Sequence, residues 1–126
     1  MHIQYQTVTL EGVKKSADIM FGIYELEAAE NAPFKRWVWT SNIFGGTLNG
    51  IDAIDFRFKS PIDNLLVVND KMKFFLKKDI LSNLRIPTKD FIELKMKLDD
   101  TYHSPNDPRD LGLLLFGINI GSSELF

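Results

Sequence analysis

Two short segments carry the residue types most able to do chemistry. Trp37 and Trp39 lie two residues apart beside Arg36, so in an extended strand both indole rings project from one face. In the second segment, Asp107-Pro108-Arg109-Asp110-Leu111-Gly112, the arginine lies between two acids and just before a long apolar stretch. An indole ring offers a flat apolar face, and a guanidinium offers five donors in a planar fork that matches a carboxylate. These features indicate recognition chemistry and not a catalytic centre.

Metal-binding and catalytic patterns are weak throughout the chain. His2 and His103 are far apart, and neither has a neighbouring His or Cys at the spacing of a metal site. An acidic segment could supply oxygen ligands to Ca²⁺ but lacks EF-hand spacing, and turn formation explains its composition equally well; its members are Asp99, Asp100, Asn106, Asp107 and Asp110. The chain has 17 acidic residues, yet no pair is singled out as a glycosidase pair would be. We predict no enzyme activity, no metal and no cofactor.

Composition places the chain among ordinary globular domains. It has 126 residues, 44% of them hydrophobic and 25% charged, which predicts a single domain over residues 1–126. A formal charge of -2 argues against nucleic-acid binding. There is no cysteine, no basic segment followed by an apolar run at the N-terminus, and no apolar stretch of membrane-spanning length. We expect a soluble cytoplasmic domain without a membrane span.

Short alternating segments predict an all-β fold. Ile54, Phe56 and Phe58 alternate with polar residues, as do Ile92, Leu94, Met96 and Leu98, so each segment should have one core face and one wet face. Residues 111–120 are nearly all apolar and suit a central strand. Further strands are expected at residues 3–10, 18–23, 34–40, 65–69 and 72–76. Only residues 79–84 could form a helical turn.

Glycine, proline and asparagine mark the expected turns between these strands. Turns are predicted at Gly45-Gly46, Asn49-Gly50, Ser60-Pro61, Asn69-Asp70 and 105–108. No Gly-Lys-Ser/Thr follows the glycine pair, so it is not a phosphate loop. Together, strands and turns favour two antiparallel sheets packed face to face.

The two segments also resemble a known type of module. Gly22-Ile23-Tyr24-Glu25-Leu26-Glu27 followed by Phe34-Lys35-Arg36-Trp37 resembles the G-Y-x-x-E … F-R-W opening of small β-sandwich modules. These modules accompany bacterial glycosyltransferases and other cell-surface polysaccharide proteins. Their closing P … D-x-R-x-L-G pattern is matched, with intact spacing, by Pro105, Asp107, Arg109, Leu111 and Gly112. The resemblance runs from about Gly22 to Ile120.

The resemblance assigns the module's signature positions to Glu27, Arg36, Trp37 and Arg109, with Glu25 and Glu30 competing for the glutamate position. One reading is structural: Arg36 pairs with a glutamate from residues 25–30, and Arg109 pairs with Asp107 or Asp110. The other reading has the same groups hydrogen-bonding sugar hydroxyls. We favour the structural reading, because charged groups with partners nearby in sequence usually satisfy each other.

The tryptophans present a similar choice. An exposed indole can stack on the C–H face of a pyranose, whereas a buried one fills the core. The opposite face of the same segment carries Phe34, Arg36, Val38 and Thr40 and is less apolar, so we expect Trp37 and Trp39 to take the core.

These observations lead to one prediction of fold and function. We expect an all-β, antiparallel two-sheet β-sandwich, jelly-roll-like or galactose-binding-like, that acts as a non-catalytic carbohydrate-associated module. It would bind glycan weakly or dock to a glycosyltransferase in bacterial surface-polysaccharide synthesis. The alternative is a protein–protein interaction or oligomerisation module without a sugar site. The candidate ligand-binding residues are Glu27, Arg36, Trp37, Trp39, Asp107 and Arg109.

Overall fold

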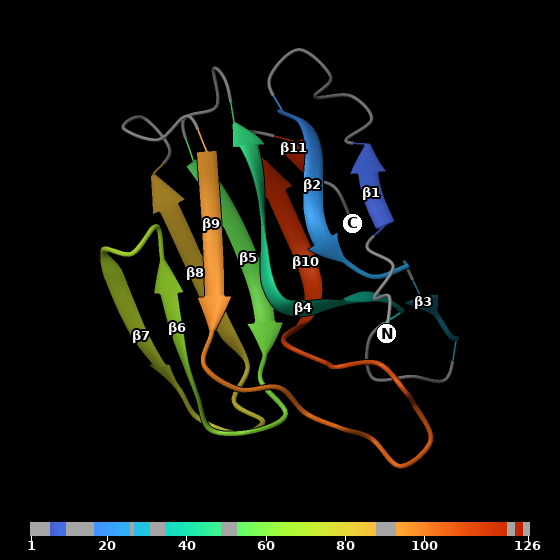
Figure 1. Ribbon diagram of the computed structural model, residues 1–126. Coiled ribbons are helices and arrows are strands. Elements are labelled where there is room, and N and C mark those ends of the chain that lie inside the picture. Colours follow the sequence, from blue (N-terminus) through green and yellow to red (C-terminus); the bar gives the residue numbers. More distant parts are fainter. Residues whose placement is uncertain are drawn as a thin grey trace.

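The computed structural model describes residues 6–9, 17–25, 27–30, 35–48, 53–87, 93–120 and 123–124. All the regular structure in these residues is β-strand (Figure 1). The strands are β1 (Gln6–Thr9), β2 (Ala17–Ile23), β3 (Glu27–Ala28), β4 (Arg36–Leu48), β5 (Ala53–Lys59), β6 (Asn64–Val68), β7 (Met72–Leu76), β8 (Ser82–Pro87), β9 (Glu93–Leu98), β10 (Leu114–Ile120) and β11 (Ser123–Glu124). Among the described residues, no helix is long and apolar enough to cross a membrane.

All the paired strands run antiparallel and join into one sheet. Its main path is β7-β6-β9-β4-β10-β5-β8, with β2 and β3 also paired to β4, β1 paired to β2 and β11 paired to β10. The sheet curls strongly into a half-barrel, so that β9 and β6 face β5 and β10 across the core (Figure 1). The all-β antiparallel prediction is therefore confirmed. The finer prediction of two separate sheets in a jelly-roll-like sandwich is not shown, because β4 belongs to both halves.

The curl is produced by the long strand β4. Its first part pairs with β3 and β10, whereas its second part pairs with β2 and β9, and the change falls between Thr40 and Ile43. Both Thr40 and Ser41 are fully buried, which breaks the alternation of a flat strand and marks the bend. Gly45-Gly46 lies within the second part of β4, so the predicted turn at this pair is wrong. The absence of a side chain lets β9 approach closely, since a Cβ on Gly45 would lie 1.9 Å from the carbonyl oxygen of Leu94.

Hydrogen bonds from the segment before β10 close the corner at the bend. The Thr40 hydroxyl donates to the Ser41 carbonyl (2.9 Å) and accepts from the Leu113 N–H (2.9 Å). The Thr40 carbonyl accepts from the Gly112 N–H at 2.7 Å, and the Thr40 N–H donates to the Leu113 carbonyl at 2.9 Å. The buried hydroxyl and backbone groups at the corner are thus paired, as burial away from water requires.

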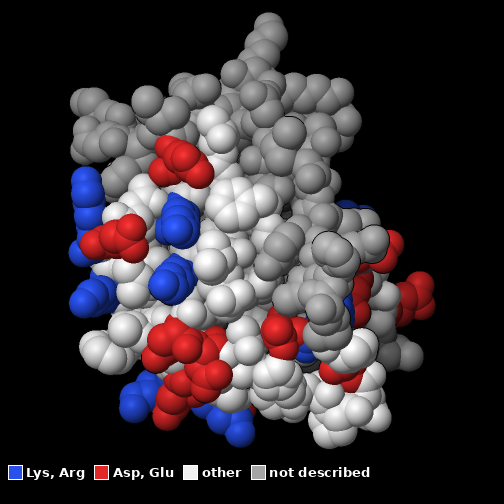
Figure 2. Space-filling view, in the orientation of Figure 1, with Lys and Arg blue, Asp and Glu red and all other residues white. Residues whose placement is uncertain are grey.

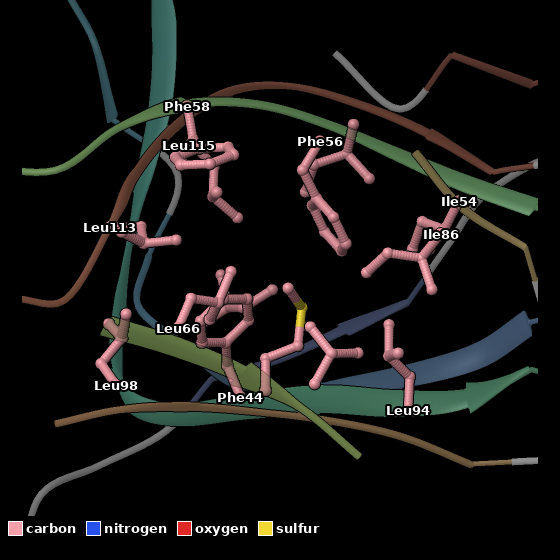
Figure 3. Close-up of a cluster of buried hydrophobic side chains, with 14 of the residues drawn as sticks. Phe44, Ile54, Phe56, Phe58, Leu66, Ile86, Leu94, Leu98, Leu113 and Leu115 are labelled. Atoms are coloured by element: carbon pink, nitrogen blue, oxygen red, sulfur yellow. The ribbon is translucent and has the colours of Figure 1, made fainter. Parts of the chain in front are cut away.

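The core lies inside the curl. Figure 3 shows Phe56, Phe58 and Leu115 on one side, with Phe44 and Leu66 opposite them. The predicted core faces are confirmed for the described residues, because β5 and β9 bury Ile54, Phe56, Phe58, Leu94, Met96 and Leu98. The predicted Ile92 lies outside the described residues. The nearly all-apolar segment 111–120 contributes Leu111, Leu113, Leu114, Leu115 and Ile118 to the buried set.

Two further local predictions have opposite outcomes. The turn predicted at Asn69-Asp70 is confirmed between β6 and β7. Both residues have positive φ, 50° and 56°, and the Lys71 N–H donates to the Val68 carbonyl, as in a tight primed turn. The helical turn expected at residues 79–84 is wrong, because β8 begins at Ser82 and pairs along β5. Tertiary pairing overrides the weak local preference there. The predicted turn at Asn49-Gly50 lies outside the described residues.

The tryptophans do not fill the core. Val38 and Thr40 are buried on the inner face of β4, and Trp37 and Trp39 are half-buried on the outer face. The expectation that the indoles would take the core is wrong. The space inside the bend suits compact side chains, and the Thr40 hydroxyl makes the buried hydrogen bonds that its backbone partners require.

Candidate functional site

Residues from the two ends of the resemblance meet in one ion cluster. Arg109 lies in the connection between β9 and β10, Glu27 begins β3, and Tyr24 follows β2 directly. Arg109 binds Asp107 as a fork, with Nε 2.9 Å from Oδ1 and Nη2 2.6 Å from Oδ2. Arg109 Nη2 also lies 3.5 Å from Glu27 Oε2. We call the set Tyr24, Glu27, Asp107 and Arg109 the arginine cluster.

Tyr24 ties the arginine cluster to the sheet. Its ring is buried, and the guanidinium carbon of Arg109 lies 5.0 Å from the ring centroid, within the range of a cation–π contact. The Tyr24 hydroxyl donates to the Asp110 carbonyl at 3.0 Å, and the Tyr24 N–H donates to the Trp39 carbonyl at 2.9 Å. The loop carrying Asp107 and Arg109 is therefore held against the first part of β4.

Asp107 binds both the backbone and the side chain of Arg109. Its Oδ1 accepts the backbone N–H of Arg109 at 3.0 Å as well as the guanidinium Nε–H. These hydrogen bonds to Arg109, opposed by partial burial, hold the pKa of Asp107 below its usual value. The hydrogen bond to Asp107 is also the main cause that raises the pKa of Arg109. Side-chain exposure of about a quarter for each partner (24% and 27%) leaves the fork reachable from solvent.

The structure separates the six candidate residues into groups. Glu27, Asp107 and Arg109 come together, as the structural reading expected for Arg109. Trp37 is the direct cross-strand partner of Glu27, so the two side chains share the outer face of the sheet, and Trp39 shares it by alternation. Arg36 starts β4 on the opposite face and is exposed.

The expected pairing of Arg36 with a glutamate from residues 25–30 is not found. Among the described residues, no ion pair involves Arg36, and Glu27 turns to Arg109 instead. The competing glutamates, Glu25 and Glu30, are exposed. The sequence did not predict the pairing of Glu27 with Arg109, because the two residues are 82 positions apart and only the curled sheet brings them together.

The acidic segment does not form a metal site in the described part of the chain. No group of three or more His, Asp or Glu side chains there is arranged to hold a metal ion. Asp99 accepts the Leu65 N–H, Asp100 bonds Asn64 and Thr101, and Asp107 bonds Arg109. His103 Nδ1 lies 3.1 Å from Asp110 Oδ1, and both side chains are at the surface. These acids organise the loops between β9 and β10.

Sequence reasoning missed one feature of the surface. Phe75, in β7, is 84% exposed, and it lines a shallow hollow of about 240 Å³ with Asp63, Leu65 and Asp99 among its neighbours. The sequence signal was available, because Phe74 and Phe75 are adjacent and a strand can bury only one of two neighbours.

Comparison of the chain with protein-family models, with curated proteins and with solved structures found no match.

Replacing Arg109 by alanine is expected to lower the free energy of unfolding by about 2 kcal/mol. Breaking an exposed ion pair costs at most about 1 kcal/mol, and breaking a buried one costs about 3–5 kcal/mol. The expected loss lies between these values because the pair of Arg109 and Asp107 is part-exposed. Urea denaturation measures the change. Arg36→Ala is the matched control and should stay within about 0.5 kcal/mol, since Arg36 is exposed. Equal effects of the two substitutions would contradict a structural role for the arginine cluster.

The lowered pKa of Asp107 predicts a specific acid sensitivity. Because the folded protein holds this carboxylate below its ordinary pKa of 3.8, the unfolded chain binds its proton first as pH falls. The contribution of Asp107 to stability is therefore fully present above that pH and is lost as pH falls through the folded pKa. Urea unfolding between pH 2.5 and 7 should show a smaller acid loss for Asp107→Asn than for the parent chain. Parallel stability curves for the two proteins would refute the assignment.

Proposed function

We propose that this protein is a non-catalytic carbohydrate-associated module of bacterial surface-polysaccharide synthesis, which binds glycan weakly or docks to a glycosyltransferase. One observation carries the proposal: Glu27 and Arg109 meet on the part-exposed outer face that Trp37 and Trp39 also share. These groups offer hydrogen-bond donors, acceptors and an apolar platform at one place. Such a mixture suits a ligand that presents hydroxyls along its edge and C–H groups on its face.

The resemblance of the sequence to glycosyltransferase-associated modules supports the same function. Its opening and closing patterns are far apart in the chain, yet Tyr24, Glu27, Asp107 and Arg109 form one cluster and Gly112 closes the corner beside them. Because residues of the opening and closing patterns meet in the folded protein, a shared site explains why both patterns occur in one chain. A jelly-roll-like relationship is part of the proposal, supported by the two halves of the curled sheet that face each other across the core.

The chemistry of the site supports binding without turnover. Asp107 has a lowered pKa and is committed to Arg109, which makes it a poor proton donor or acceptor near neutral pH. Arg109 keeps its charge at all accessible pH values. A small electrostatic fork beside aromatic rings can orient a ligand but offers no activated nucleophile.

A protein-interaction module without a sugar site is the second candidate function. It is favoured by Ile80 and Leu81, which are 55% and 60% exposed in the connection between β7 and β8. Adjacent apolar side chains at the surface are typical of contacts with another protein. Sedimentation velocity at increasing concentration tests self-association, and Leu81→Asp should abolish any that depends on this connection.

Glycan titration monitored by intrinsic fluorescence tests the first candidate. We expect a dissociation constant of roughly 1 mM to tens of µM, corresponding to about -4 to -6 kcal/mol, because the site is shallow and has few donors. Trp37 and Trp39 are the chain's only tryptophans and report from the outer face itself. Glu27→Gln should weaken binding, whereas Glu30→Gln, an exposed control, should not. Failure of every surface glycan to change fluorescence or NMR shifts at millimolar concentration would favour the interaction module.

A further inference from the structure

We infer that the hollow beside Phe75 is a second glycan subsite, which takes a neutral pyranose and disfavours uronic acids. The inference rests on the proposed function for the ligand class, but it concerns a different surface from the arginine cluster. The hollow has a volume of about 240 Å³ and is lined by Asp63, Asn64, Leu65, Phe75, Leu76, Lys77 and Asp99.

The strand register builds this site on the outer face of the sheet. Leu65 opposes Phe75 across β6 and β7, and the Asp99 N–H bonds the Leu65 carbonyl on the other side. The three side chains therefore form one row across three neighbouring strand ends, spanning about 10 Å. Asp63 and Lys77 lie two residues from Leu65 and Phe75 in the next row. A flat ring resting on Phe75 would pass over Leu65 and reach the carboxylates.

Phe75 provides the platform for such a ring. With 84% of its surface exposed, it is the most exposed of the large hydrophobic side chains in the described part of the chain. Four of the six residues that line the hollow with Phe75 are polar or charged, and they border an exposed lining that is mostly apolar. An aromatic face among carboxylates matches the alternating apolar and hydroxyl surfaces of a pyranose, whereas a purely apolar partner would leave the carboxylates desolvated.

Two carboxylates are held in fixed positions around the platform. Asp63 Oδ1 accepts the Lys78 N–H at 2.8 Å, and Asp99 Oδ1 accepts the Leu65 N–H at 2.9 Å. Each leaves its Oδ2 without a hydrogen bond among the described residues. Asn64, beneath them, is buried and bonds Asp100 at both its amide nitrogen and its oxygen, which makes the floor rigid. Preorganised acceptors of this kind bind hydroxyl donors without paying the entropy of ordering a loop.

The charge of the site selects among sugars. Figure 2 shows acidic side chains gathered near the lower ends of β6 and β9 in the orientation of Figure 1, where Asp63 and Asp99 lie. The charged residues that line the hollow are Asp63, Asp99 and Lys77, so its lining carries a net negative charge. A ligand carboxylate would meet net repulsion, whereas sugar hydroxyls would donate to the free Oδ2 atoms. The site therefore fits neutral hexosides better than acidic glycans.

The test compares neutral and uronic-acid oligosaccharides by ¹H–¹⁵N correlation NMR on the full chain. Phe75→Ala should weaken binding of the neutral oligosaccharide by about tenfold or more, with Phe75→Tyr retaining it. Lys73→Ala is the matched control, since Lys73 is exposed on the same face of β7 but lies outside the hollow, and it should leave the affinity unchanged. The melting temperature of Phe75→Ala should stay within about 3 °C of the parent, because the ring is exposed.

Three results would overturn the inference, and they are distinguishable. Neutral-glycan binding that survives Phe75→Ala but is lost in Glu27→Gln would leave the proposed function standing and remove the second subsite. If the uronic-acid ligand bound more tightly than the neutral one, with NMR shift changes around Phe75, the charge argument would be contradicted. No binding of any glycan by the parent chain would remove the proposed function and the subsite together. The inference would be supported if the neutral glycan changed the NMR shifts around Asp63, Phe75 and Asp99 in the parent chain, and if only Phe75→Ala abolished these changes.

Discussion

Replacing Gly112 by alanine is expected to lower the free energy of unfolding by about 3 kcal/mol or more. A Cβ on Gly112 would lie 2.5 Å from the Ser41 carbonyl oxygen, 2.5 Å from the Thr40 hydroxyl and 2.8 Å from a methyl of Leu98. The first neighbour is backbone and the second is held by two buried hydrogen bonds, so neither can move away cheaply. The loss is a large part of the roughly 5–15 kcal/mol that stabilises a typical domain.

Gly117→Ala is the matched control for this substitution. Gly117 is also buried and lies in β10, but the nearest atoms to a Cβ there belong to the side chain of Arg57, the closest of them 3.1 Å away. That side chain is exposed and long, so it can shift by a few tenths of an ångström, and we expect a change within about 1 kcal/mol of either sign. Urea denaturation of both variants measures the difference. Equal stabilities would show that the corner at Thr40 relaxes, and would contradict its role in bending β4.

Replacing Phe44 by alanine is expected to cost about 3–5 kcal/mol. Phe44 is fully buried and meets the edge of Phe56 from the facing half of the sheet, with ring centroids 6.3 Å apart and planes at 89°. The substitution removes a buried aromatic contact between the two halves and leaves a cavity.

Phe75→Ala serves as the comparison for Phe44. The same chemical change at a ring that is 84% exposed should alter stability by no more than about 0.5 kcal/mol. Thermal and urea unfolding of both variants measure the contrast. A loss at Phe44 below about 1 kcal/mol would mean that the two halves do not depend on this packing, and that the curled sheet is held mainly by its hydrogen bonds.

Local patterns determined much of the fold. The alternation around Ile54, Phe56 and Phe58 identified both the strand and its buried face, because a strand has a period of two whatever its partners are. The turn at Asn69-Asp70 was predictable because these residues accept positive φ. The sequence offered Asp107 and Asp110 as local partners for Arg109, and the structure pairs it with Asp107.

Tertiary structure alone decided the features that depend on distant neighbours. Alternation shows that Trp37 and Trp39 share a face but not which face is inside, and the bend at Thr40 settles that. Gly45-Gly46 has the composition of a turn, yet two flanking strands hold it extended. Glu27 reaches Arg109 because the sheet curls. The sequence by itself therefore determined the strands and their periods, whereas bends, inner faces and long-range ion pairs came from packing, which local chemistry does not encode.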